Sequence, residues 1–236
     1  MAITEYHLSD RFLKDDGRVF LTGVQALARL PIEQMRIDKR NGLKTAAFVS
    51  GYPGSPLGGF DMELEKALRV ATDVDVVLQP AVNEELGATA VMGSQLATEQ
   101  PDATYEGVLG IWYGKGPGID RAGDALRHAN FTGTSSKGGA IALVGDDPAA
   151  KSSTIPSSSD ATIYDLHMPL FYPGDVQEVV DLGRHAVALS RMTGLWTSMK
   201  IVSPVADGSG TVDLGLDRVE IVTPDLSIPG DPNGTI

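Results

Sequence analysis

The chain has 236 residues, 42% of them hydrophobic, and this size is enough to bury one substantial core, so we expect one main domain. The net charge is -12 and the 19 basic residues are scattered, which argues against a nucleic acid partner because phosphate neutralisation needs clustered Lys and Arg. With no cysteine, the chain offers no disulfide, thiolate zinc site or iron–sulfur ligand.

The sequence also shows no pattern typical of a membrane-spanning segment or a signal peptide. No apolar run reaches the length of about 18 residues that a spanning helix needs. The first residues, Met1 to His7, lack the charged and apolar regions of a signal peptide. The sequence therefore predicts a cytoplasmic protein without a membrane partner.

The predicted elements alternate along the chain. Residues 1–21 are polar and turn-like and are expected to form an N-terminal arm, followed by a helix at 22–39 that Pro31 interrupts. We then predict strands at 44–50, 74–79, 105–112, 140–144 and 198–203, and helices at 60–71, 84–99, 119–130 and 175–192. This order is typical of an α/β domain in which helices cover both faces of a parallel sheet.

The domain is expected to span residues 22–204. From 205 to 236, Gly, Pro, Asp, Ser and Thr dominate, which indicates a linker or the start of a following domain. The abrupt end at Ile236 leads us to expect that the chain is truncated relative to a longer enzyme.

A carboxylate at the start of one helix is the first candidate for function. The run from Val74 to Leu78 predicts a buried parallel strand, and the small residues between Gly87 and Ala97 indicate a helix that packs closely. Glu84 would then lie at the carboxyl edge of the sheet, where open α/β folds bind ligands. Alternatively, Asn83 is a helix cap and the first-turn acids after it lie in water. The residues alone leave both interpretations open.

Two loops follow strands at the same edge. The segment Tyr52-Pro53-Gly54-Ser55-Pro56 is at its simplest a tight turn. The segment Tyr113-Gly114-Lys115-Gly116-Pro117-Gly118 opens a helix with accessible N–H groups, which suits an anion. As a dinucleotide fingerprint this second segment fails, because the third glycine is missing and Pro117 removes an amide. A NAD-binding Rossmann oxidoreductase is therefore the disfavoured alternative.

Together these residues resemble the pyrimidine-binding domain of the thiamine diphosphate-dependent 2-oxoacid:ferredoxin oxidoreductases. The spacing from Glu84 to Gly93 is similar to the glutamate-to-glycine helix of thiamine enzymes, and the loop at 52–56 resembles a substrate-side loop of the ferredoxin-linked branch. The pattern is most similar to the indolepyruvate ferredoxin oxidoreductase family over residues 15–205. It is also carried by the segments 112–118, 145–148 and 151–154.

The resemblance implies the thiamine diphosphate-binding (pyrimidine domain) fold and gives each candidate a role. Glu84 is the expected catalytic acid, whereas Glu85 points about 100° away around the helix and is expected to be solvated. The expected cofactor-binding residues are Gly87, Gly114, Lys115, Gly116 and Gly118. The expected substrate-binding residues are Tyr52, Ser55 and Lys115, although Tyr52 could serve packing and Lys115 could be an ordinary surface lysine.

The resemblance also implies partners. The expected reaction is the oxidative decarboxylation of a 2-oxoacid, indolepyruvate or another arylpyruvate, to an acyl-CoA, with electrons passed to ferredoxin. Thiamine diphosphate would be shared with a diphosphate-binding domain or subunit in an oligomer, with Mg²⁺ and [4Fe-4S] clusters held elsewhere. We predict no metal ligand here, even at the paired Asp146 and Asp147, and no activity for this chain alone. A non-catalytic thiamine-fold assembly module is the other alternative.

Overall fold

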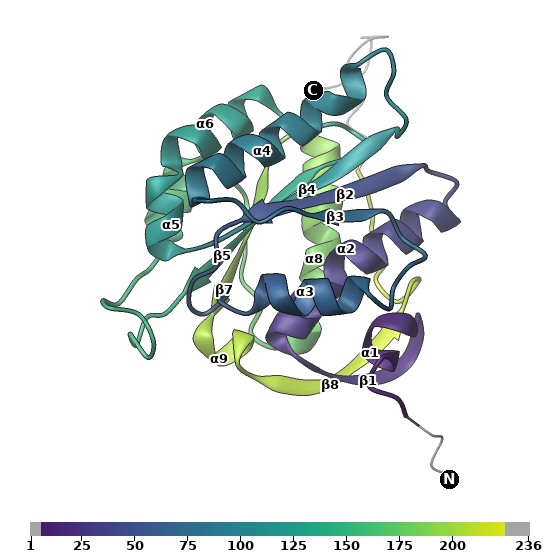
Figure 1. Ribbon diagram of the computed structural model, residues 1–236, viewed down its shortest axis with the longest axis horizontal. Helices are drawn as coiled ribbons and strands as arrows, with labels where there is room; N and C mark the ends of the chain where they lie inside the picture. Colours follow the sequence, from purple (N-terminus) through teal and green to yellow (C-terminus); the bar gives the residue numbers. More distant parts are fainter. Residues whose placement is uncertain (1–5, 225–236) are drawn as a thin grey trace.

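A six-stranded parallel sheet forms the centre of the computed structural model, which describes residues 6–224 (Figure 1). The strand order is β3-β2-β4-β5-β7-β6. The strands are β2 (Thr45–Gly51), β3 (Val76–Leu78), β4 (Gly107–Lys115), β5 (Ala140–Asp146), β6 (Leu170–Phe171) and β7 (Thr197–Val202). Strands β4, β5 and β7 are buried along nearly their whole length, which is why they appear as apolar runs in the sequence. The parallel sheet confirms the predicted α/β fold class.

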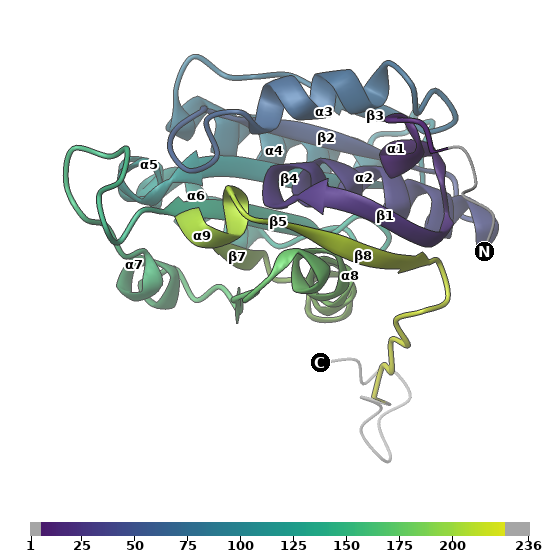
Figure 2. The same ribbon diagram turned by 90° about the horizontal axis from the view of Figure 1, so that it is seen from below.

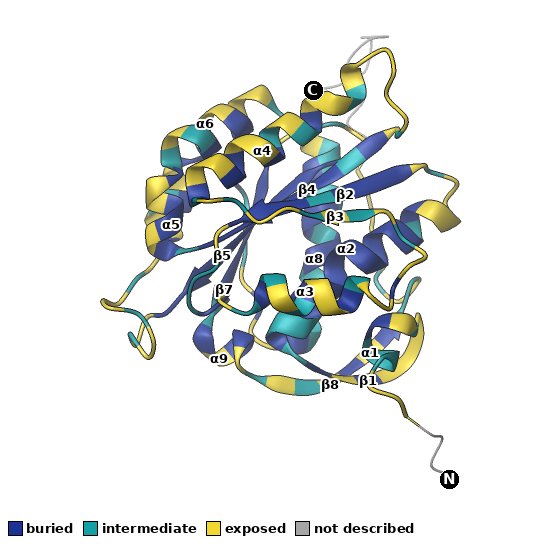
Figure 3. Cartoon of the chain, viewed as in Figure 1, coloured by how far each residue is buried: buried dark blue, intermediate teal, exposed yellow. Residues whose placement is uncertain are grey.

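Helices cover both faces of this sheet (Figures 1 and 2). One face carries α2 (Gly23–Arg40), α3 (Phe60–Leu68) and α8 (Val176–Thr193). The other carries α4 (Glu84–Leu96), α5 (Gly116–Arg121), α6 (Gly123–Thr132) and α7 (Asp160–Asp165), with a 3-10 turn at Ala97–Glu99. Each layer has its own apolar core, as the buried inner surfaces in Figure 3 show. Within residues 6–224, none of the helices is both long and apolar enough to cross a membrane.

Helix α2 differs in one respect from the predicted helix at 22–39. Thr22 caps it, because its hydroxyl accepts from the Gln25 N–H at 3.2 Å while the Gln25 side chain accepts from the Thr22 N–H at 3.0 Å. Pro31 lies inside the helix, and the helix continues to Arg40. Pro31 is buried in the apolar layer, so tertiary packing holds the helix across the position where one backbone hydrogen bond is missing.

A two-stranded ribbon lies outside the main sheet, against α2 and α8 (Figure 2). Strand β1 (Asp16–Thr22) pairs antiparallel with β8 (Ser209–Gly215), and short helices α1 (Asp10–Leu13) and α9 (Ser203–Ala206) accompany it. The expected turn-like arm therefore contains a regular strand, and so does the segment expected to be a linker or the start of a following domain. Leu21 and Val212 are fully buried in the core, so packing against the helices stabilises these two strands. The boundaries of the domain stay a prediction.

Two buried arginines of α2 hold the N-terminal segment in place. Arg29 bonds the Glu33 carboxylate at 2.7 Å and also donates to the carbonyl oxygens of Arg11 and Lys14. Arg36 donates to the Phe12 carbonyl at 2.9 Å. Because buried charges need partners, these contacts tie the segment before β1 to the core.

Candidate functional site

The candidate site lies where the winding of the sheet reverses. Strand β2 pairs with β3 on one side and with β4 on the other, so the chain crosses β2 on its way from β3 to β4. Ligands of open α/β sheets bind outside the carboxyl ends of the strands at such a switch point. Gly51 pairs with Tyr113 at this edge, and both α4 and α5 begin beside it.

Glu84 is buried at the first position of α4, with 6% of its surface exposed. Asn83 is the helix cap, since its side chain accepts from the Leu86 N–H at 2.9 Å. Trp112, fully buried in β4, donates its indole N–H to the Glu84 carbonyl at 2.9 Å. Glu85 is exposed. The interpretation with both acids in water is thus wrong for Glu84, although its capping residue is the expected one.

Helix α5 packs directly against the Glu84 side chain. A Cβ atom added to Gly118 would lie 2.8 Å from Cγ and 3.0 Å from Oε1 of Glu84. Arg121, on the same helix, places its Nε 4.0 Å from the other carboxylate oxygen, while its guanidinium remains largely exposed. The sequence reasoning missed Arg121. Its position three residues after Gly118, on the same side of a helix, was the available signal.

The other glycines of the predicted cofactor set make close backbone contacts. A Cβ at Gly87 would lie 2.8 Å from the Gly51 Cα, and one at Gly114 would lie 2.6 Å from the Trp112 ring. These contacts bring α4 close to β2 and make room for the indole that holds the start of α4. The cofactor-binding roles of Gly87, Gly114 and Gly116 stay predictions.

The loop at 52–56 approaches Lys115. Tyr52 is partly exposed and donates its N–H to the Tyr113 carbonyl at 3.0 Å. A Cβ at Gly54 would lie 2.8 Å from Cδ of Lys115, so the lysine stem packs on this loop. Ser55 is half-buried, and its hydroxyl is hydrogen-bonded to that of Ser152. The structure therefore places the Lys115 stem, at the end of β4, against Gly54 in the loop that carries Ser55.

The two aspartates at the end of β5 anchor the following loop. Asp147 accepts the N–H groups of Lys151, Ser152 and Ser153 at 2.9, 2.8 and 3.0 Å. These bonds, with that of Ser152 first, lower the pKa of the Asp147 carboxyl to about 2. The sequence reasoning considered Asp147 only as a magnesium ligand, which it doubted, and missed this anchoring role.

Asp146 is the second buried carboxylate at this edge. Its Oδ2 accepts from the backbone and hydroxyl of Ser159 at 2.8 and 2.9 Å and lies 3.4 Å from the Lys200 ammonium. Its Oδ1 has no hydrogen-bond partner within the described part of the chain and faces Gly116, where a Cβ would lie 2.8 Å away. Helix α5 therefore begins between the carboxyl groups of Asp146 and Glu84.

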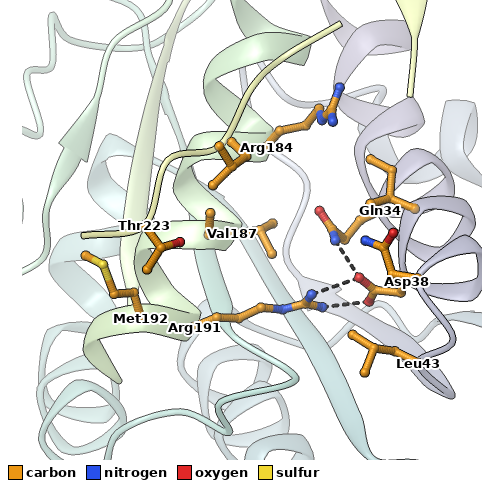
Figure 4. Close-up of a pocket in the computed structure, with 12 residues that line it drawn as sticks. Gln34, Asp38, Leu43, Arg184, Val187, Arg191, Met192 and Thr223 are labelled. Atoms are coloured by element: carbon orange, nitrogen blue, oxygen red, sulfur yellow. Dashed lines mark hydrogen bonds and ion pairs between the residues drawn. The ribbon is translucent and has the colours of Figure 1, made fainter. Parts of the chain in front are cut away.

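A cavity of about 370 Å³ lies at the opposite end of the sheet, between α2, α8 and residues 221–223 (Figure 4). Its buried Asp38 is held by both terminal nitrogens of Arg191, at 2.8 and 2.7 Å. Gln34 and Thr45 donate to the same carboxylate at 2.7 Å each. Asp38 is therefore fully engaged by Arg191, Gln34 and Thr45.

Comparison with known proteins identifies several that are similar to this chain. No family model matches the chain. It is 26% identical over 203 residues to the indolepyruvate oxidoreductase subunit IorA of Methanothermobacter thermautotrophicus, a match that covers 86% of this chain and 29% of that protein. The IorA subunit of Pyrococcus abyssi is 23% identical over 202 residues, with 86% and 28% covered. The chain thus spans less than a third of the length of these relatives.

A solved structure has a similar fold. It is a 2-oxoglutarate:ferredoxin oxidoreductase from Magnetococcus marinus with 2-oxoglutarate, coenzyme A and succinyl-CoA bound. The TM-score is 0.64 at 16% sequence identity, and the match covers 94% of this chain and 35% of that one. The relatives and this fold confirm the resemblance to the indolepyruvate ferredoxin oxidoreductase family that the motifs indicated.

Proposed function

We propose that this chain is the pyrimidine-binding part of a thiamine diphosphate-dependent 2-oxoacid:ferredoxin oxidoreductase acting on indolepyruvate or another arylpyruvate. The observation that carries the proposal is the buried carboxyl group of Glu84, which lies against Gly118 at the switch point of the sheet. The names of the curated relatives support this substrate class, and that of the solved structure supports an acyl-CoA product.

The residues around Glu84 fit an aminopyrimidine. The carboxyl group is buried, the backbone of Glu84 is fixed by Trp112, and Gly118 packs against the Glu84 side chain without a side chain of its own. A flat heterocycle with a hydrogen-bonding ring nitrogen suits such a place, since a buried carboxyl group needs a partner. When bound, thiamine diphosphate supplies a cationic ring that accepts electrons during decarboxylation.

Each residue of this chain then has a physical task. Glu84 holds a proton against the pyrimidine nitrogen, and its carboxyl group keeps its place because Asn83 caps the helix beneath it. Lys115 and Ser55 offer an ammonium and a hydroxyl to the substrate carboxylate from the same edge. The diphosphate, Mg²⁺ and iron–sulfur clusters belong to another domain or subunit, and ferredoxin and coenzyme A bind the assembled oligomer.

The test compares two neighbouring substitutions in the assembled enzyme, made from the complete polypeptide and its partner. Glu84→Gln keeps the size of the side chain and its hydrogen bonding but cannot move a proton. We expect it to retain thiamine diphosphate and to lose about 10²–10⁴-fold in turnover of arylpyruvate. Glu85→Gln is the matched control, and because Glu85 is exposed we expect a change of less than about threefold.

The direct readout is hydrogen–deuterium exchange at the thiazolium C2 of the bound cofactor. Slowed exchange in Glu84→Gln alone would support the assignment. Equal rates in the two variants, or a larger loss in Glu85→Gln, would contradict it. A wild-type assembly that binds the partner but turns over no 2-oxoacid would instead favour a non-catalytic assembly module.

A further inference from the structure

Two loops that are far apart in the sequence meet at the candidate substrate side. Ser55 lies in the loop after β2 and Ser152 in the loop after β5, and their hydroxyl groups are hydrogen-bonded to each other across a separation of 97 residues. Both side chains are accessible to solvent. The contact is therefore a bridge at the open edge of the sheet rather than part of the apolar core.

Hydrogen bonds to Asp147 fix the backbone at Ser152. Asp147 lies at the end of β5, is fully buried, and accepts three consecutive N–H groups, those of residues 151 to 153. Lys151 is held further by an ion pair from its ammonium to Asp207 at 2.9 Å. A carboxylate that accepts several backbone N–H groups fixes the local backbone. The Ser152 hydroxyl is thus presented on an anchored turn.

The paired hydroxyls have hydrogen-bonding capacity left over. Two serine hydroxyls carry two protons, and their mutual bond uses one of them. The second proton is available to an acceptor on a ligand. The Lys115 stem packs on Gly54, next to Ser55 in the chain, which brings a cationic side chain to the same loop. A ligand matched to such donors carries oxygen acceptors and a negative charge, as a 2-oxoacid does.

We propose that Ser152 is a second substrate-contacting hydroxyl, acting with Ser55 on the carboxylate end of the 2-oxoacid, and that Asp147 is the positioning residue that holds Ser152 in place. This inference rests on the proposed function and adds a specificity-determining loop to it. The loop after β5 becomes one wall of the substrate site, with the loop after β2 as the other.

The test uses the assembled enzyme and N-phenyloxamate, an unreactive analogue of phenylpyruvate. For Ser152→Ala we expect the dissociation constant of the analogue, measured by calorimetry, and the KM for phenylpyruvate to rise about 10-fold. We expect kcat and the dissociation constant of thiamine diphosphate to stay within about twofold, because the proposal gives the Ser152 hydroxyl a contact to the substrate carboxylate and none to the cofactor. Ser152→Thr keeps the hydroxyl and should restore binding.

Thr154→Ala is the matched control, since it removes another exposed hydroxyl from the same loop. Equal effects of Ser152→Ala and Thr154→Ala would overturn the proposal. So would a parallel loss of thiamine diphosphate binding in Ser152→Ala, because the loop would then have only a structural role.

Asp147→Asn tests the positioning role. The amide keeps one acceptor oxygen in place of two, so at least one of the three N–H bonds is lost. We expect analogue binding to weaken as in Ser152→Ala and the double variant to be no weaker than either single one. Fully additive losses would overturn the role of Asp147.

The wild-type assembly separates failure of the proposed function from failure of this inference. If the wild-type assembly neither binds the analogue nor turns over pyruvate, 2-oxoglutarate, phenylpyruvate or indolepyruvate, the proposed function itself is wrong and the inference falls with it. If the wild type is active and Ser152→Ala is unchanged, only the inference is wrong.

Discussion

Gly118 packs against the side chain of Glu84. A methyl group at position 118 would come within 2.8 Å of Glu84 Cγ, closer than a carbon–carbon contact allows. The N-terminal turn of α5 and the first residue of α4 are therefore fitted to each other. The glycine lets α5 approach the Glu84 side chain without a steric clash.

Replacing this glycine should displace the carboxyl group. For Gly118→Ala we expect a loss of about 1–3 kcal/mol in the free energy of unfolding, because the added methyl overpacks the site. Activity of the assembled enzyme should fall by more than this stability loss explains. Thermal denaturation and arylpyruvate turnover check the two effects. Gly123→Ala is the control, since a Cβ there meets nothing within 4 Å. Equal losses of stability and turnover in the two variants would contradict the close packing of Gly118 on Glu84.

The anchor at Asp147 predicts an acid-sensitive loop. Hydrogen bonds from the N–H groups of Ser152 and Lys151 lower the pKa of this carboxyl from 3.8 to about 2. Since the folded pKa lies below the unfolded one, the contribution to stability is complete above about pH 4 and disappears as the pH falls through about 2. Amide hydrogen exchange of residues 151–153 should accelerate over this window. In Asp147→Asn, the exchange of these amides should not show this pH dependence. If the pH dependence persisted in the variant, a titratable group other than Asp147 would have to cause it.

The buried pair of Arg29 and Glu33 should respond strongly to loss of one partner. Their side chains are 0% and 4% exposed, with a contact of 2.7 Å. Glu33→Gln leaves a buried guanidinium without a counter-charge, so we expect a loss of about 3–5 kcal/mol in denaturant unfolding. The control is Glu65→Gln, which breaks the exposed pair with Arg69 and should cost less than about 1 kcal/mol. Similar losses of unfolding free energy in the two variants would contradict the idea that burial makes the Arg29–Glu33 pair sensitive to loss of one partner.

The ribbon of β1 and β8 should behave as part of the core. Leu21 is fully buried, whereas the adjacent Phe20 on the other face of β1 is 54% exposed. Leu21→Ala should lower the free energy of unfolding by about 2–5 kcal/mol, as buried leucines do. Phe20→Ala should change it by about 0.5 kcal/mol or less. A small effect of Leu21→Ala would indicate that the segment before α2 is a separable arm after all.

The sequence by itself determined the parallel α/β architecture and the candidate acid. Buried parallel strands appear as short apolar runs, and the covering helices between them keep a regular period, so both are visible locally. A cap, an acid and a run of small residues after a strand made Glu84 a candidate, and the resemblance to the thiamine enzymes, not the local pattern, selected it over a solvated first-turn acid. The glycines at 116 and 118 were also found, although the pattern did not show that each faces a carboxyl group.

Only the tertiary structure decided what joins distant segments. Strand β1 pairs with β8 near the other end of the described chain, and Ser55 meets Ser152 across 97 residues. Local patterns contain no information on such pairings, since they depend on where the sheet places the ends of its strands. The approach of Arg121 to Glu84 arises in the same way, because the two residues lie on separate helices that the fold brings together.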